Sequence, residues 1–271
     1  MAGSAFPGKG AQDDRSVQCR ETTRGERPSV SRSRLPSGAF PVSPSYYPMF
    51  VSLEGRVCLV VGGGTVAERK IRGLLPSGAA IRVVARTLTS GLWEWVRDGR
   101  VQYLGETYRE DLLEEADLVF AATSDAGLNE QVARQAGERR LWCNTATGPE
   151  MGSFIVPSLI ERGPLAIAVS TTGLSPAVAR QIREKLEGEF GPEWASFLEW
   201  MGRLRKLTLS KSLGSDEKQR LFRKVSNLPL PAWIREGRRE EAFHAVLEVC
   251  NGWIHREELS RIWDELWKPS S

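Results

Sequence analysis

A strand, turn and helix signature between residues 57 and 67 constrains this chain more than any other feature. The apolar run VCLVV meets three consecutive glycines, and apolar residues at helical spacing follow. Within it Gly62, Gly64 and Ala67 fit G-x-G-x-x-A, the dinucleotide-binding fingerprint. The first glycine makes a tight turn, the second lets backbone approach a pyrophosphate, and the third small residue lets the helix pack on the strand. A nucleotide-binding turn is therefore predicted, with a purely structural glycine turn as the alternative.

The same rhythm of strands and helices continues to about residue 146. Further strands are predicted in the stretches AIRVVARTLT, VQYL, DLVFAATSD and LWCNTA, and a helix in GLNEQVARQAGERR. Five strands alternating with helices predict an α/β chain with a Rossmann-type parallel, doubly wound sheet. Ligands of such sheets bind beyond the carboxyl ends of the strands. The candidate site residues are those that close each strand: Gly62 to Val66, Arg86 and Thr87, Thr123 to Asp125, and Asn144 to Pro149.

Two of these polar positions have two interpretations each. NAD-binding proteins commonly place a carboxylate after the second strand, whereas Arg86 stands there and favours a 2′-phosphate, as in NADP, or is a solvated loop residue. Asp125 and Asn129 are expected either to start the next helix by capping it or, for Asp125, to contact a ligand.

Beyond residue 150 the organisation of the sequence changes. The stretch SFIVPSLIERGPLAIAVSTTGLSP predicts a short apolar run, a turn broken by proline and a strand from Leu165 to Ser170. Ser175 before Pro176 is then a good helix N-cap. Amphipathic helices follow from about Pro192, and their Trp and Leu positions indicate core or subunit contacts.

The chain therefore divides into four expected regions. Residues 1–45 are rich in Ser, Pro, Gly and Arg, lack periodicity and are expected to be a disordered extension, either a diluted transit-type segment or an over-extended start. Residues 46–150 form the nucleotide-binding domain, 151–190 a linking segment, and 191–271 a helical C-terminal domain.

Composition narrows the functional classes. The 37 basic and 34 acidic residues are mixed along the chain, which argues weakly for an anionic ligand and poorly for a nucleic-acid groove. No apolar run approaches the roughly 20 residues needed to cross a bilayer, so a cytoplasmic, non-membrane protein is expected. The four cysteines and two histidines lack metal-ligand spacing, so reduced structural thiols and no metal site are expected.

Several motifs together resemble one family. VVGGGTVAERK, AATSDAGLN and CNTATGPEMGSFIVPS look like the siroheme synthase N-terminal family, which comprises the precorrin-2 dehydrogenase and sirohydrochlorin ferrochelatase proteins. The resemblance covers roughly residues 46 to 190 and continues more loosely into the helical tail. It is specific because general Rossmann proteins do not share the last two motifs.

The resemblance implies an oxidoreductase that uses NAD to convert precorrin-2 into sirohydrochlorin, a tetrapyrrole with eight carboxylates, for siroheme or cobalamin synthesis. Some relatives also insert a metal ion. It implies a homodimer formed by residues 151–190, which also contribute to the tetrapyrrole cleft. Since the family uses NAD without a carboxylate after the second strand, NAD is preferred to NADP. The cofactor contacts implied by the resemblance are Thr65, Val66, Arg86 and Thr87, to which the fingerprint adds Gly62 and Gly64 and the strand ends add Thr123. The expected substrate contacts are Asn144 and Ser175.

The chain departs from the family at one position. Thr147 stands where the family has the aspartate regarded as catalytic. A threonine hydroxyl does not titrate near neutral pH, so general base work is lost there.

Three hypotheses follow from this departure. Dehydrogenation survives, with Asp125, Glu150 or water handling the proton, because the cofactor carries the hydride chemistry. Chelation is impaired, because it needs a base. Alternatively, the chain is a non-catalytic NAD- or tetrapyrrole-binding protein. Ser175 also matches a serine phosphorylated in some relatives, although helix capping is sufficient reason for it.

Overall fold

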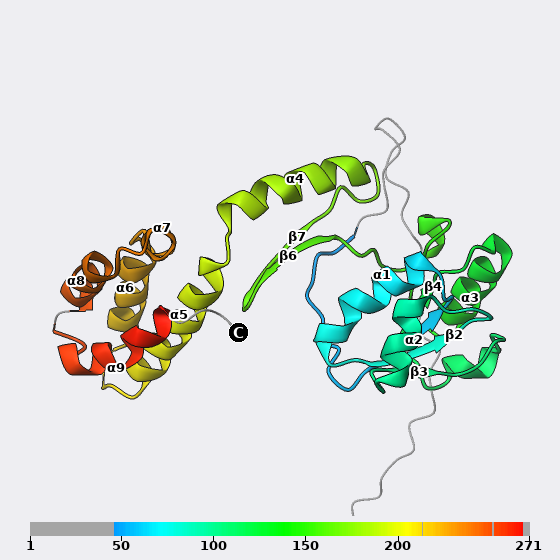
Figure 1. Ribbon diagram of the computed structural model, residues 1–271, viewed down its shortest axis with the longest axis horizontal. Coiled ribbons are helices and arrows are strands. Elements are labelled where there is room, and N and C mark those ends of the chain that lie inside the picture. Colours follow the sequence, from blue (N-terminus) through cyan, green and yellow to red (C-terminus); the bar gives the residue numbers. More distant parts are fainter. Residues whose placement is uncertain (1–45, 213, 251, 268–271) are drawn as a thin grey trace, which may run out of the picture. The chain divides into compact units, whose positions relative to one another are not determined.

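The computed structural model describes residues 46–212, 214–250 and 252–267 (Figure 1). The expected disordered extension over residues 1–45 lies outside this part of the chain. A five-stranded parallel sheet with the order β3-β2-β1-β4-β5 forms the first region, so the predicted Rossmann-type fold is confirmed. Its strands are β1 (Val57–Val61), β2 (Ala80–Val84), β3 (Val101–Tyr103), β4 (Leu118–Ala121) and β5 (Trp142–Thr145).

Strand β1 lies in the centre of this sheet and explains why its sequence is uniformly apolar. It pairs in parallel with β2 on one side and β4 on the other. Its side chains alternate between two cores, with Cys58 and Val60 in one and Leu59 and Val61 in the other. A strand covered on both faces gains nothing from polar residues, so it reads as a continuous hydrophobic run rather than an alternating one.

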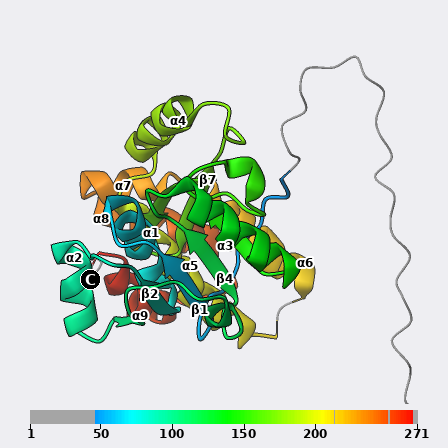
Figure 2. The ribbon, with the colours of Figure 1, turned by 90° about the vertical axis from the view of Figure 1, so that its right-hand side faces the viewer.

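Helices cover both faces of the sheet, as the parallel crossovers require (Figure 2). The first core joins the sheet to α1 (Thr65–Leu74) and α2 (Ser90–Arg97), and the second joins it to α3 (Ala126–Glu138). Sequence periodicity did not predict α2, which is a short helix capped by the Thr89 side chain. Short 3-10 turns occur at η1 (Leu75–Ser77), η2 (Glu110–Leu113) and η3 (Pro149–Met151).

A hairpin and a helix follow the sheet. Strands β6 (Ser158–Arg162) and β7 (Leu165–Val169) pair antiparallel, and α4 (Pro176–Glu189) contacts both of them. The sequence pattern predicted β7, but for the residues of β6 it predicted an apolar run and a proline-broken turn. The prediction was wrong because SLIER carries only two apolar residues, and pairing with β7 rather than its own pattern makes it a strand.

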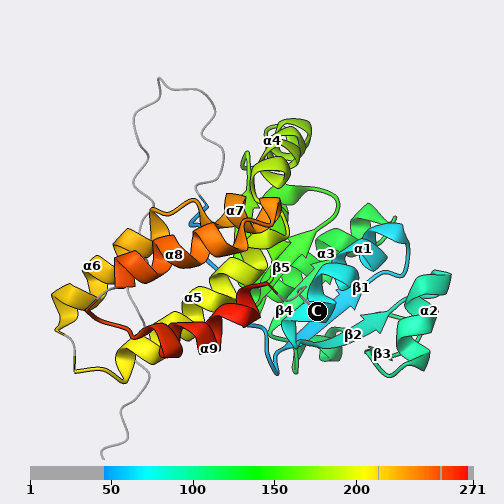
Figure 3. The same cartoon turned by 60° about the vertical axis from the view of Figure 1, so that its left-hand side comes forward.

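The C-terminal region consists of helices packed around their own core (Figure 3). Its large side chains confirm the core interpretation: Trp200 is fully buried and meets Trp263 edge to face, with ring centroids 5.7 Å apart. The sequence pattern did not predict the seven-residue helix α7, because this helix is too short to show helical periodicity. The helices are α5 (Glu193–Leu209), α6 (Ser215–Ser226), α7 (Leu230–Glu236), α8 (Arg239–Cys250) and α9 (Arg256–Leu266).

Three of the cysteines lie in these cores as buried free thiols, as predicted. Burial raises the pKa of the Cys58 and Cys143 thiols to about 11 and that of Cys250 to about 12. Protonated thiols of this kind behave as small apolar side chains. The fourth, Cys19, lies outside the described residues.

Candidate functional site

The turn between β1 and α1 accepts only glycine at its first two positions. Gly62 has a φ of +126°, and a Cβ there would lie 2.3 Å from the carbonyl oxygen of Ala122. A Cβ on Gly63 would lie 2.1 Å from the carbonyl oxygen of Thr87. The turn is therefore clamped between the ends of β4 and β2, which the sequence fingerprint indicated for Gly62 but not for Gly63.

Gly64 differs from both of them. Its φ is −83°, and no atom lies within 4 Å of the position a Cβ would take. It is the N-cap of α1, and no side chain bonds the free backbone N–H groups of that helix end. Unbonded N–H groups and a helix dipole equivalent to roughly half a positive charge make such an end a site for phosphate. The open space around Gly64 is thus what close approach of a pyrophosphate requires.

The last residue of the fingerprint, Ala67, lies where α1 packs against the sheet. It is fully buried in the core that this helix shares with β1. A larger side chain there would push the helix away from the sheet. The small residue therefore holds the helix N-terminus close to the strand ends, as the pattern predicted.

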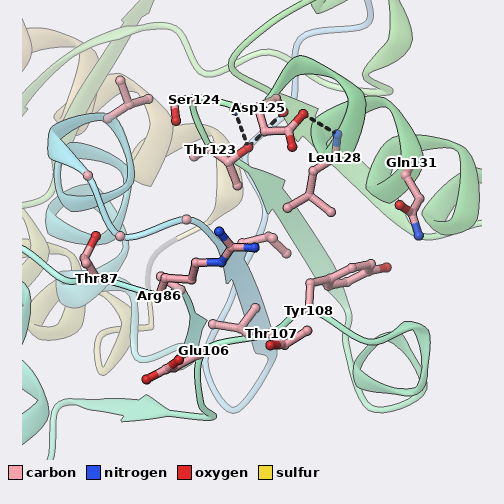
Figure 4. Close-up of a pocket in the computed structure, with 18 of the residues that line it drawn as sticks. Arg86, Thr87, Glu106, Thr107, Tyr108, Thr123, Ser124, Asp125, Leu128 and Gln131 are labelled. Atoms are coloured by element: carbon pink, nitrogen blue, oxygen red, sulfur yellow. Dashed lines mark hydrogen bonds between the residues drawn. The ribbon is translucent and has the colours of Figure 1, made fainter.

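A pocket of about 930 Å³ opens beyond the carboxyl ends of the strands, in front of this turn (Figure 4). It brings together residues that the sequence analysis had taken from separate strand ends. The predicted residues that line it are Gly62 to Val66, Arg86, Thr87 and Thr123 to Asp125. The predicted residues after β5, Asn144 to Pro149, are not among those that line it. A second group of lining residues, which follows β3 or belongs to α3, was not predicted from the sequence: Glu106, Thr107, Tyr108, Gly127, Leu128 and Gln131. Because ligands of such sheets bind beyond the carboxyl ends of the strands, the end of β3 should have predicted Glu106, Thr107 and Tyr108.

Arg86 extends into this pocket from the end of β2 (Figure 4). The part of the chain that the structure describes provides no ion-pair partner for its guanidinium. Glu106 lines the same pocket from the end of β3, so one basic and one acidic side chain border this end. A ribose hydroxyl, which is neutral, and a ribose phosphate, which is an anion, would interact differently with these two charges.

Tyr108 forms part of the pocket wall and is held from behind. Its hydroxyl donates to Gln135 Oε1 at 2.9 Å, and Gln135 donates in turn to Glu110 at 2.6 Å. Arg139 forms an ion pair with the same Glu110 at 2.7 Å. Burial and the Glu110 carboxylate raise the pKa of Tyr108 to about 12, so the ring stays neutral. A neutral aromatic ring fixed in this way is suited to packing against a flat ligand group.

Asp125 takes the first of its two predicted roles. It is the N-cap of α3, and its carboxylate accepts the N–H of Leu128 at 3.1 Å while still lining the pocket. Asn129 does not start the helix, so that expectation was wrong. It lies within the first turns of α3, fully buried, and its amide bonds the backbone and hydroxyl of Thr123. Hydrogen bonds to Thr123, which follows β4, rather than helix capping, explain this residue.

The segment after β5 is tied down by its own polar side chains. Asn144 is buried, donates to the carbonyl of Phe154 at 3.0 Å and accepts from Lys70. Thr145 Oγ1 donates to the Gly148 carbonyl at 2.8 Å. Thr147 is half-buried, and its Oγ1 accepts from Asn129 Nδ2 at 3.0 Å. The two implied substrate or catalytic positions on this strand end are therefore held by hydrogen bonds within the protein.

Lys70 lies under this segment rather than in solvent. Its ammonium stands 5.6 Å from the centre of the Phe120 ring. Burial and the nearby Arg69 lower its pKa below the usual range for lysine. Because its hydrogen bond goes to the neutral Asn144, this charge lacks a carboxylate partner within the described residues.

Ser175 confirms its predicted capping role. Its hydroxyl oxygen accepts the N–H of Val178 at 3.3 Å at the start of α4, with Pro176 as the first helical residue. It is not among the residues of the pocket at the sheet.

The residues that the structure describes contain no cluster of three His, Cys, Asp or Glu side chains arranged to hold a metal ion. Over the same residues, the helices are all too short or too polar to cross a membrane.

The sheet, the glycine turn and the pocket in front of it define a dinucleotide-binding protein of the Rossmann class. Comparison with known families agrees with this class: a family model described as "Putative NAD(P)-binding" matches residues 49–158. A second model, described as "Sirohaem biosynthesis protein central", matches residues 162–189. The cofactor of this chain is therefore a nicotinamide dinucleotide.

Relatives narrow the class to one family. The chain is 38% identical over 210 residues to siroheme synthase of Sodalis glossinidius, which is 76% of this chain and 44% of that protein. It is 39% identical over 179 residues to siroheme synthase of Salmonella typhi, or 66% of this chain and 39% of that protein. Among solved structures, SirC, a precorrin-2 dehydrogenase, matches with a TM-score of 0.63 and 27% identity, over 75% of this chain and 98% of SirC.

The chain belongs to the siroheme synthase N-terminal family, as its motifs predicted. It spans less than half the length of the curated relatives given above. Its similarity to SirC, in contrast, extends over almost the whole of that protein.

Proposed function

We propose that this chain is an NAD-dependent precorrin-2 dehydrogenase that forms sirohydrochlorin. The observation that carries the proposal is the pocket around the glycine turn at the strand ends. Its residue Thr123 is joined through Asn129 to Thr147, which follows β5. The similarity to SirC over nearly all of that protein supports the same reaction. Bound NAD supplies the hydride acceptor, so the chain itself has to bind, orient and shield the two ligands.

Each part of the pocket has a task in this proposal. Gly62 and Gly63 hold the turn against its neighbouring strands, and Gly64 with the first turn of α1 receives the pyrophosphate. Thr65, Val66, Arg86, Thr87 and Thr123 contact the rest of the dinucleotide. The ring of Tyr108 and the side chain of Leu128 offer an apolar wall for the adenine.

The charges that border the pocket support NAD rather than NADP as the proposed cofactor. A 2′-phosphate would gain from Arg86, but it would also enter a space bordered by the carboxylate of Glu106. The charge near the ribose is thus balanced rather than positive, and a neutral hydroxyl suits it better than a dianion. Comparing the dissociation constants of the two dinucleotides by calorimetry tests this preference directly.

Thr147 determines which chemistry is expected to remain. Oxidation of precorrin-2 removes a hydride, which the cofactor takes, and a proton, which solvent or an exposed carboxylate such as Glu150 takes. Metal insertion removes pyrrole protons at the metal-binding face and depends more strongly on a base. We therefore expect dehydrogenation to be retained and ferrochelatase activity to be weak.

A homodimer is part of the proposal. A two-stranded hairpin is marginal by itself, and the hairpin and α4 expose several large apolar side chains: Val156, Leu159, Leu174, Val178 and Ile182. A second copy of the same surface, related by a twofold axis, would bury them. A cytoplasmic location, where the buried thiols stay reduced, fits the same picture.

One experiment separates the proposed enzyme from a binding protein without activity. Purified protein is mixed with precorrin-2 and NAD under anaerobic conditions, and NADH absorbance is followed together with the spectrum of sirohydrochlorin. Formation of both is expected. If NAD binds and no turnover follows, the dehydrogenase proposal is wrong and a non-catalytic binding protein replaces it. Adding Fe²⁺ or Co²⁺ to preformed sirohydrochlorin measures chelation separately.

A further inference from the structure

The buried amide of Asn129 joins the ends of two strands. Its Oδ1 accepts the backbone N–H of Thr123 at 3.0 Å and the hydroxyl of Thr123 at 2.8 Å. Its Nδ2 donates to the carbonyl of Thr123 at 3.0 Å and to Thr147 Oγ1 at 3.0 Å. One side chain on α3 thus links a residue of the cofactor pocket, after β4, with the position of the family's aspartate, after β5.

The chemistry of its partners fixes the orientation of this amide. A backbone N–H is only a donor and a backbone carbonyl is only an acceptor, so Oδ1 has to face the Thr123 N–H and Nδ2 the Thr123 carbonyl. Flipping the amide would break both bonds in a site that water does not reach, since Asn129 is fully buried. Nδ2 therefore always donates toward Thr147.

This orientation decides what the Thr147 hydroxyl does. Because Nδ2 carries only donors, Thr147 Oγ1 has to accept that bond, and its own hydrogen is left to donate elsewhere. Over the residues that the structure describes, no acceptor for that hydrogen is recorded. An ionised aspartate could accept the same bond from Asn129 but would have no hydrogen to donate. Replacement of the carboxylate by a hydroxyl thus converts a base into a directed donor.

We infer that Asn129 is a positioning residue, which aims the Thr147 hydroxyl hydrogen at an acceptor oxygen of the ligand bound beyond β5. The inference rests on the proposed function, which supplies two such oxygens: the carboxamide oxygen of the nicotinamide and a carboxylate oxygen of the tetrapyrrole. Both are hydrogen-bond acceptors and both belong at this end of the sheet. Thr147 is then a binding residue where the family has a base.

The test measures binding rather than turnover. NAD and sirohydrochlorin are titrated separately, by calorimetry, into the wild type, Thr147→Val and Thr147→Ser. Valine has the shape of threonine without the hydroxyl, and serine retains it. Loss of one hydrogen bond in Thr147→Val is expected to weaken one of the two ligands, by roughly three- to tenfold if the acceptor is the neutral carboxamide and by about tenfold or more if it is the carboxylate. Thr147→Ser is expected to stay within about twofold of the wild type.

Thr208→Val is the matched control. Like Thr147, this threonine has a hydrogen-bonded hydroxyl, which donates to the carbonyl of Leu204 in α5, but it is fully buried and belongs to the helical core. Its removal should leave both affinities unchanged, and thermal unfolding of every variant shows whether the fold is intact. Weaker NAD binding in Thr147→Val identifies the carboxamide as the acceptor, and weaker sirohydrochlorin binding identifies the carboxylate. Wild-type affinity for both ligands overturns the inference.

The role of Asn129 is tested in the same assay. In an Asn129→Ala background the hydroxyl is no longer aimed, so adding Thr147→Val should cost less than about twofold. A full three- to tenfold loss in that background shows that Thr147 acts without Asn129. If Asn129→Ala does not fold, Asn129→Ser replaces it, because it keeps an acceptor for the Thr123 N–H. Absence of NADH formation by the wild type would defeat the proposed function, whereas these affinities decide the inference separately.

Discussion

Replacing Gly64 by alanine should separate cofactor binding from folding. The glycine has an ordinary φ of −83°, and a Cβ would have no neighbour within 4 Å. Alanine is a poorer N-cap than glycine by roughly 0.5–1 kcal/mol. It also reduces the freedom of the unfolded chain, which stabilises the fold by about 0.4–1 kcal/mol. The two effects nearly cancel, so the free energy of unfolding should change by less than about 0.5 kcal/mol and Tm by about 1–2 °C.

Nucleotide binding should respond quite differently. A phosphate oxygen that accepts a backbone N–H lies about 2.9 Å from the nitrogen, and the new methyl group would occupy part of that approach. We expect the dissociation constant for NAD to rise at least tenfold, which corresponds to about 1.4 kcal/mol. Calorimetric titration with NAD and thermal unfolding of the same samples give the two numbers.

Gly73→Ala provides the comparison within the same helix. Gly73 lies in the last turn of α1, and a Cβ there also has no neighbour within 4 Å. Alanine in a helix should stabilise it by up to about 1 kcal/mol, raising Tm by about 2–4 °C, without affecting NAD. Wild-type affinity in Gly64→Ala would refute the phosphate site at this helix end. A fall in Tm of more than about 5 °C would refute the open space around Gly64.

Three further predictions concern the turn, the ribose end and the thiols. Gly62→Ala should lower the free energy of unfolding by about 3 kcal/mol or more in urea titrations, because its Cβ would clash with a carbonyl at 2.3 Å and its φ is +126°; an unchanged midpoint would contradict this geometry. Arg86→Ala should weaken NADP about tenfold and NAD less than about threefold, since one charge pair is lost only with the phosphate; equal losses would place Arg86 elsewhere. The three buried thiols have pKa values raised above the ordinary 9.0, so the unfolded chain loses their protons first and stability falls as pH rises above 9. Each should cost about 1 kcal/mol between pH 9 and 10, measured by urea unfolding at both pH values, and Cys143→Ala should reduce that slope by about one third.

The local signals in the sequence were sufficient for the class of fold and for half of the pocket. Gly62 and Ala67 indicate a turn whose geometry depends on their small size, and Gly64 indicates one that leaves space for a ligand. Ser175 is recognisable as a helix N-cap because its hydroxyl oxygen accepts a backbone N–H only three residues away. Such features involve neighbours in the chain, so a pattern of residue types is enough to recognise them.

Other parts of the structure could not be predicted from local sequence patterns. β6 became a strand only through pairing with β7, and α7 is too short for periodicity to indicate it. Tyr108 joined the pocket because β3 ends beside β2, and the network behind its ring involves residues more than twenty positions away. The family motifs identified the position of Thr147, but they did not say what its hydroxyl bonds.

The sequence by itself determined that this chain folds as a Rossmann-type α/β protein, binds a dinucleotide at the β1 turn and lacks the family's aspartate at residue 147. Only the tertiary structure decided that Asn129 is not a cap but a clamp between the ends of β4 and β5. The physical reason is that an asparagine offers a donor and an acceptor anywhere, and their partners are fixed only when distant strands are brought together. That Thr147 cannot act as a base follows from its residue type, but that its hydroxyl oxygen accepts a bond from Asn129 depends on this contact.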